Sequence, residues 1–61
     1  MKTDYIIVRF YNTGYADVVT EQGTLYTDKA QGESWVRLAR MKGYREMWKQ
    51  YDNGDQTYWF N

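Results

Sequence analysis

The chain has 61 residues, of which 20% are Phe, Trp or Tyr, and eight Lys and Arg residues balance eight Asp and Glu residues. A chain of this length forms one domain at most and buries only about 60% of the surface of its unfolded state. We therefore expect a single small domain over residues 1–61, with aromatic side chains supplying much of the core. Because the net charge is zero, binding to nucleic acid would need a local patch.

Three residue types, Cys, His and Pro, are absent. Without Cys and His, disulfides and the usual transition-metal sites are excluded, and we expect neither a cofactor nor a metal. The general acid–base and nucleophilic residues of most enzymes are also missing, and the single Ser34 falls inside a predicted helix. The sequence therefore favours a protein that is not an enzyme.

The sequence also bears on localisation. Secreted domains of this size usually carry disulfides, so a Cys-free chain favours the cytoplasm. The N-terminal Met1 to Asp4 leads into only four apolar residues, 5–8, before Arg9. This run is too short for a signal peptide or a membrane span, and we expect no membrane association.

The first predicted element is a strand from Tyr5 to Tyr11, a segment rich in β-branched and aromatic residues. Asn12-Thr13-Gly14 follows as a three-residue loop, with its glycine in the left-handed position of a G1 bulge. This loop sets a register that places Arg9 opposite Asp17 as an ion pair. The other predicted pairs are Tyr11 with Tyr15, Phe10 with Ala16, Val8 with Val18 and Ile7 with Val19.

A second hairpin is predicted nine residues later. Glu21-Gln22-Gly23 repeats the three-residue spacing and leads into a strand from Thr24 to Thr27. One face of the resulting three-stranded sheet is the natural core face. It would carry Ile6, Val8, Phe10, Ala16, Val18 and Tyr26.

A helix is predicted to follow Asp28, which is a suitable N-cap, with Thr27 as the alternative. Gln31 stands three residues later, as in a capping box, and Gly43 is placed for a left-handed cap after about Lys42. At 100° per residue the helix is amphipathic. The predicted apolar half holds Ala30, Trp35, Leu38, Ala39 and Met41. The opposite half holds Lys29, Glu33, Val36, Arg37 and Arg40.

The last predicted element is a hairpin of Tyr44–Tyr51 and Asp55–Phe60 around Asn53-Gly54, which favours a two-residue type I′ turn. The predicted pairs are Lys49 with Tyr58, Trp48 with Trp59 and Met47 with Phe60. The flanking Asp52 and Asp55 resemble part of a Ca²⁺ loop, but the longer ligand series is missing and a tight turn explains them better.

Together these elements predict an α+β fold: an antiparallel sheet of four or five strands with one packed helix, in the order ββ(β)αββ. One helix cannot cover both faces of such a sheet. We therefore expect a protein-binding surface on the uncovered face, where aromatic residues supply the contacts that dominate interfaces. The residues predicted to bind the partner protein are Tyr5, Ile7, Arg9, Tyr11, Tyr15, Asp17, Trp48 and Trp59.

An alternative function is binding to nucleic acid. Basic residues gather around the predicted helix end and the next strand, interleaved with aromatic residues, as in proteins that bind single strands. The residues predicted for this patch are Arg37, Arg40, Lys42, Arg45 and Lys49. A third possibility is a structural homodimer formed through the uncovered surface.

In general character, this short, aromatic-rich chain without Cys or His resembles the small accessory proteins of bacteriophages and mobile elements. Many such proteins bind host machinery. The resemblance covers no specific motif, but it implies an inhibitor of a host protein that acts by steric occlusion. We therefore expect a non-enzymatic protein-interaction module.

Overall fold

The computed structural model describes residues 4–61. Met1 to Thr3, the first residues of the segment that we expect not to be a signal peptide, lie outside the described residues. Five strands and one helix follow one another in the predicted order, and the α+β prediction is confirmed with the third strand present. The elements are β1 (Ile6–Phe10), β2 (Tyr15–Thr20), β3 (Gly23–Asp28), α1 (Lys29–Met41), β4 (Glu46–Asp52) and β5 (Asp55–Phe60).

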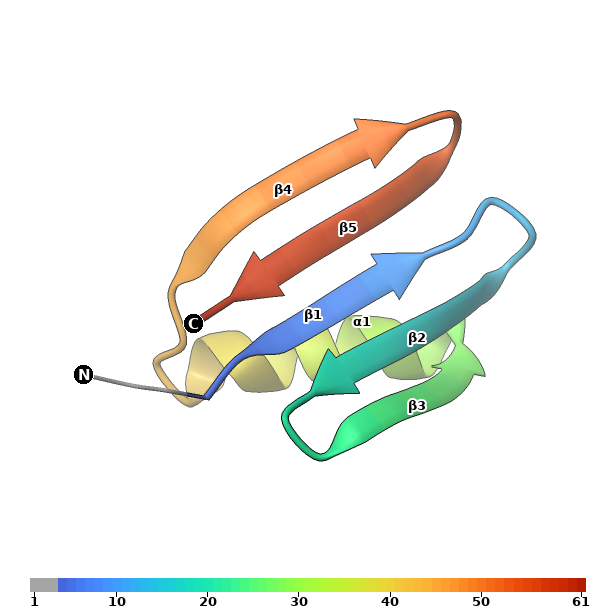
Figure 1. The fold of residues 1–61 in the computed structure, drawn as a ribbon. Helices are drawn as coiled ribbons and strands as arrows, with labels where there is room; N and C mark the ends of the chain where they lie inside the picture. Colours follow the sequence, from blue (N-terminus) through green and yellow to red (C-terminus); the bar gives the residue numbers. More distant parts are fainter. Residues whose placement is uncertain (1–3) are drawn as a thin grey trace.

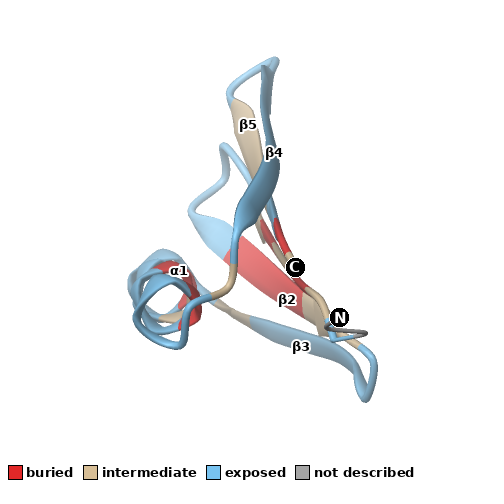
Figure 2. Cartoon of the chain, turned by 90° about the vertical axis from the view of Figure 1, so that its left-hand side faces the viewer, coloured by how far each residue is buried: buried red, intermediate tan, exposed pale blue. Residues whose placement is uncertain are grey.

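The strands form one antiparallel sheet in the order β3-β2-β1-β5-β4 (Figure 1). The sequence predicts the two terminal hairpins but not this order, in which β5 returns to lie beside β1. Helix α1 packs against β1, β2 and β3 on one face only. Figure 2 shows the β4–β5 hairpin rising away from the helix, and none of the elements within residues 4–61 lies on the opposite face of the sheet.

The first hairpin has the predicted register. Arg9 lies opposite Asp17 and Val8 opposite Val18, and the backbone N–H of Tyr11 donates to the Tyr15 carbonyl at 2.8 Å. Gly14 has a φ of +98°, as the left-handed position of the loop requires. Loop chemistry and partner chemistry agree here, which makes the register readable from the sequence.

The second hairpin is one residue tighter than predicted. Thr20 pairs with Gly23, so the turn holds only Glu21 and Gln22. This shift moves each β3 side chain to the other face of the sheet. Tyr26, predicted in the core, lies opposite Asp17 on the uncovered face, where it is 79% exposed, and Leu25 takes the helix side opposite Val18.

Helix α1 begins and ends close to the predicted residues. Asp28 caps it by accepting a hydrogen bond from the Gln31 backbone N–H at 2.8 Å, and Gly43 follows with a φ of +82°. The predicted apolar half is only partly correct, since Ala39 is buried and Trp35 packs against the core. The buried helix residues are Gly32, Val36 and Ala39. Of the predicted apolar half, Trp35 is half-buried and Ala30, Leu38 and Met41 are exposed.

The reason is the close approach of the helix at Gly32. A Cβ placed on Gly32 would lie 2.7 Å from the Phe10 ring and 2.9 Å from the Ala16 Cβ. The glycine therefore sits directly against the sheet and brings Val36 and Ala39, on the same side of the helix, into the core. A pattern weighted toward large apolar residues does not detect a contact made by the smallest one.

The C-terminal hairpin has the predicted type of turn, with φ values of 52° at Asn53 and +83° at Gly54. Trp48 pairs with Trp59 as predicted. A β-bulge between Glu46 and Trp48 shifts the end of the ladder, so Phe60 pairs with Glu46 and not with Met47. Phe60 is fully buried and joins the core between β1 and α1.

The core is small and lies between α1 and the middle of the sheet. Its buried side chains are Ile6, Val8, Ala16, Val18, Val36, Ala39 and Phe60. Phe10 and Tyr58 pack at its margin in an edge-to-face contact with ring centroids 5.9 Å apart. Within residues 4–61 no helix has the length and apolar character needed to cross a membrane.

Candidate functional site

The sheet face turned away from α1 is the first candidate site, and we call it the open face. Strand alternation places on it the side chains that do not enter the core. Ladder partners share a face, which joins Arg9 to Asp17, Asp17 to Tyr26 and Ile7 to Trp59. The predicted partner-binding residues on this face are Ile7, Arg9, Tyr11, Tyr15, Asp17, Trp48 and Trp59.

The centre of the open face is a buried carboxylate. The Asp17 side chain is only 2% exposed although it lies on the sheet face opposite α1. Arg9 donates from Nε to Oδ1 at 2.7 Å and from Nη2 to Oδ2 at 3.0 Å, and the Tyr11 hydroxyl donates to Oδ2 at 2.7 Å. Neighbouring side chains thus replace water around the carboxylate, and its acceptor oxygens are occupied.

The same contacts shift two pKa values. The hydrogen bond from Arg9 to the Asp17 carboxylate is the main factor that raises the pKa of the guanidinium. The hydrogen bond that Tyr11 donates to Asp17 is the main cause of the raised pKa of the phenol, because ionisation would remove the donor. The cluster is a fixed polar feature in the middle of an aromatic surface.

An apolar hollow of about 400 Å³ lies beside this cluster and is lined by Ile7, Trp48 and Trp59. Both indole side chains are substantially exposed, Trp48 by 47%. The cross-strand pairs Ile7 with Trp59 and Trp59 with Trp48 hold the three side chains in a row across β1, β5 and β4. We call these three residues the tryptophan hollow.

The far end of the same strands is acidic. Asp52 and Asp55 are directly opposite each other and line a small hollow with Gln50 and Thr57. The Asp55 carboxylate also accepts a hydrogen bond from the Asn12 backbone N–H at 2.8 Å. The open face therefore has an apolar part, a neutral ion pair and a negatively charged end.

Two exposed tyrosines, Tyr15 and Tyr26, also lie on the open face. Tyr15 is 68% exposed and lies at the start of β2. Tyr26 was missed as a candidate because the predicted turn was one residue too long. Tyr5 is the predicted residue that the structure does not join to the others, since it precedes β1 and lines a separate hollow with Trp35 and Leu38 beside the helix end.

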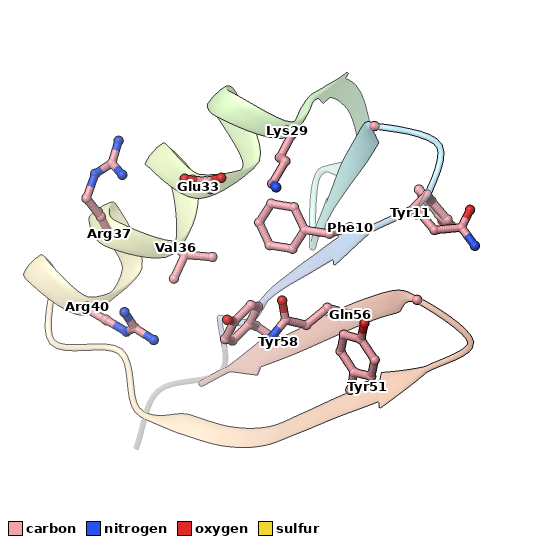
Figure 3. A pocket seen from close by; sticks show the side chains of 13 residues that line it. Phe10, Tyr11, Lys29, Glu33, Val36, Arg37, Arg40, Tyr51, Gln56 and Tyr58 are labelled. Atoms are coloured by element: carbon pink, nitrogen blue, oxygen red, sulfur yellow. The ribbon is translucent and has the colours of Figure 1, made fainter.

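The second candidate site is a groove of about 690 Å³ between α1 and the β4–β5 hairpin, on the opposite side of the sheet (Figure 3). We call it the helix–hairpin groove. It exists because the hairpin rises beyond the helix and α1 covers only the other half of the sheet. Its apolar floor is formed by Phe10, Val36 and Tyr58. Its walls carry Lys29, Glu33, Arg37 and Arg40 from the helix and Tyr51 and Gln56 from the hairpin.

The predicted basic patch is only partly assembled here. Arg37 and Arg40 line the groove, and the Lys49 ammonium lies 5.2 Å from the centre of the Tyr58 ring. Arg40 also approaches that ring, at 5.9 Å, while its Nη2 bonds Glu46 at 3.2 Å.

The two remaining basic residues lie elsewhere. Lys42 lines the hollow at the helix end together with Tyr5. Arg45 is absent from the groove lining and pairs through its backbone with Asn61, whose N–H donates to the Arg45 carbonyl at 2.9 Å. Lys42 and Arg45 therefore do not line the groove with Arg37 and Arg40, although all four residues are close in the sequence.

Metal-binding groups do not cluster in the described part of the chain: residues 4–61 hold no group of three or more potential acidic, His or Cys ligands. Comparison of the chain with protein-family models, curated proteins and solved structures finds no match. Function must therefore be inferred from the two surfaces themselves.

Proposed function

We propose that the protein is a non-enzymatic, cytoplasmic interaction module whose open face binds a partner protein and occludes the partner's own functional surface. The observation that carries this proposal is the tryptophan hollow, in which two partly exposed indoles and Ile7 surround an apolar space on an uncovered sheet face. Trp is the residue most enriched among those that dominate binding energy at interfaces. A host protein as the target, and inhibition as the outcome, follow the general character of small phage and mobile-element accessory proteins.

The charge on the open face defines the partner further. Arg9 and Asp17 neutralise each other, and at the end of β4 and β5 this face carries the acidic pair Asp52 and Asp55. Trp48 and Asp52 lie on the same strand and the same face, about 13 Å apart at roughly 3.3 Å per residue. The partner surface that fits presents an apolar side chain to the tryptophan hollow and a Lys or Arg about that distance away.

The test compares two exposed aromatic residues of β4 that point to opposite faces. Trp48→Ser alters the tryptophan hollow, whereas Tyr51→Ser alters the helix–hairpin groove. Each tagged variant is used to capture proteins from a host lysate, and captured proteins are identified by mass spectrometry. We expect one protein captured in stoichiometric amount by the wild type and by Tyr51→Ser, and lost with Trp48→Ser.

Charge reversal supplies an independent check. Asp52→Lys keeps the tryptophan hollow intact and should weaken capture of the same protein, most strongly at low salt, where charge interactions are least screened. Capture that survives Trp48→Ser, or that is lost equally with Tyr51→Ser, refutes the assignment of the open face. A wild-type protein that captures nothing above the level of both variants refutes the proposed function.

A second candidate function is binding of single-stranded nucleic acid in the helix–hairpin groove. The observation in its favour is the combination of Arg37 and Arg40 with the exposed Tyr51 in one groove, since basic grooves with aromatic stacking surfaces bind single strands. Glu33 in the same groove opposes it. Of the five basic residues predicted to bind nucleic acid, Arg37 and Arg40 line this groove.

Fluorescence anisotropy with a labelled single-stranded oligonucleotide tests this candidate. Arg37→Gln should weaken binding and reduce the slope of log K against log salt by about 0.7, the contribution of one phosphate contact. Arg45→Gln is the matched control, because Arg45 does not line the groove. Equal losses for the two variants, or no binding at low salt, would exclude the groove as a nucleic-acid site.

A further inference from the structure

The β3 edge of the sheet differs from an ordinary protected edge. β3 pairs only with β2, so its outer backbone groups have no ladder partner within residues 4–61. Gly23 to Tyr26 are exposed, and residues 23–27 contain no charged side chain and no proline. Natural proteins generally blunt such edges, because an open, uncharged strand is a template for another strand.

The opposite edge is protected in the usual ways. β4 carries Glu46, Lys49 and Asp52 along its length, and a β-bulge between Glu46 and Trp48 distorts its ladder. Charges and bulges both discourage pairing with a further strand. The β4 edge therefore has charges and a bulge that oppose strand addition, whereas the β3 edge over residues 23–27 has neither charges nor proline and is suitable for it.

A hollow of about 240 Å³ lies directly beside the β3 edge on the helix side. Its apolar lining includes Val18, Leu25 and Trp35, and Gly23 contributes no side chain to fill it. Leu25 is 49% exposed although it points to the same side of the sheet as the core. An apolar side chain from an added strand would enter this hollow and cover Leu25.

We infer that the β3 edge binds a second copy of this chain, through antiparallel pairing of β3 with β3 about a two-fold axis at Leu25. In this register Leu25 faces Leu25 of the second copy, Thr24 faces Tyr26 and Gly23 faces Thr27. No like charges meet, and the second Leu25 lies diagonally across from Gly23, within reach of the adjacent hollow. Residues 23–27 can pair with a second copy of themselves without a clash of charge. They carry no charged side chain that would favour the strand of a different protein over a second copy.

This dimer goes beyond the proposed function and is independent of it. A two-fold axis perpendicular to the sheet would join two five-stranded sheets into one and keep both open faces on the same side. The two tryptophan hollows would then face the same direction and be available together. A partner with two copies of the matching surface would be held by both, which increases the apparent affinity without a new contact.

Sedimentation velocity of the complete chain over a wide concentration range tests the dimer. We expect dimers for the wild type, monomers for Leu25→Lys, which places charge in the middle of the β3 edge, and dimers for Gln50→Lys at the β4 edge. Near-ultraviolet circular dichroism checks that Leu25→Lys remains folded. A wild type that stays monomeric at the highest concentration, or loss of dimer with Gln50→Lys alone, overturns the inference. Trp48→Ser should remain dimeric, so failure of the proposed function and failure of the dimer are distinguishable.

The absence of cysteine allows a sharper test that does not rely on loss of assembly. At a two-fold axis, a residue faces its own copy, so Leu25→Cys should form an intermolecular disulfide on mild oxidation. Gln50→Cys is the control for random collisions between exposed thiols at the other edge. The expected result is nearly complete linkage for Leu25→Cys and only slow, concentration-dependent linkage for Gln50→Cys. Equal linkage of the two variants, or faster linkage at Thr24→Cys, refutes the proposed pairing.

Discussion

Replacing Arg9 with Met should destabilise the protein more than replacing its ion-pair partner Asp17 with Asn. The Asp17 side chain is 2% exposed and that of Arg9 is 43% exposed. Removing Arg9 therefore leaves a buried carboxylate with the Tyr11 hydroxyl as its remaining side-chain donor. Removing the charge of Asp17 leaves a guanidinium that water already reaches.

The expected magnitudes follow from this asymmetry. Breaking a buried pair so that one charge stays behind costs about 3–5 kcal/mol, which we assign to Arg9→Met. Asp17→Asn weakens charge-assisted hydrogen bonds and costs about 1.5–3 kcal/mol, toward the lower end because Arg9 is solvated. A chain of 61 residues has a total stability of only about 3–9 kcal/mol. Arg9→Met should therefore lose most of the stability of the fold.

Urea unfolding followed by Trp fluorescence measures these differences. The double variant Arg9→Met with Asp17→Asn should be more stable than Arg9→Met alone, because the stranded carboxylate is gone. Arg37→Met is the matched control, an exposed arginine that donates to the Ser34 hydroxyl at 3.0 Å, and should change stability by less than about 0.5 kcal/mol. A loss for Asp17→Asn that equals or exceeds that for Arg9→Met would refute the reasoning.

Two further predictions concern the sheet and its packing. Gly32→Ala should lower the free energy of unfolding by about 1–3 kcal/mol, measured by thermal or urea unfolding, because the new methyl group would overlap the Phe10 ring and Ala16. This cost should outweigh the roughly 1 kcal/mol by which alanine is favoured over glycine in a helix. Unchanged or increased stability would contradict the close contact. The raised pKa of Tyr11 means that its stabilising hydrogen bond to Asp17 is complete below about pH 10, the ordinary value, and is lost as the pH rises through the folded-state pKa. Stability of the wild type should therefore decline more steeply above pH 10 than that of Tyr11→Phe, and parallel declines would show that this phenol contributes nothing to the effect.

The features that were predicted correctly depend on short-range chemistry. Asn12-Thr13-Gly14 and Asn53-Gly54 determine their turns, and each turn determines the register of the strands beside it. Asp28 defines the start of the helix through one hydrogen bond to a residue three positions away. Such interactions can be read from a single sequence because both partners lie within a few residues.

The features that were missed depend on contacts between distant segments. The helix face is decided by Gly32 against Phe10, and nothing near Gly32 in the sequence indicates that neighbour. One surplus residue in the predicted turn at Glu21 assigned Tyr26 to the core, since strand faces alternate at every position. The helix–hairpin groove could not be foreseen because it results from the sheet order, in which β5 and not β3 flanks β1.

The position of β5 also has a consequence for folding. β1 and β5 are separated in the chain by four other elements, so the central pairing of the sheet is its most distant one. Closing that long segment costs chain entropy before Phe60 reaches its place in the core opposite Ile6. The local hairpins and the capped helix should form early, and β1 should then be paired with β2 along one edge only until β5 arrives at the other. We therefore expect the pairing of β1 with β5 to set the rate of folding.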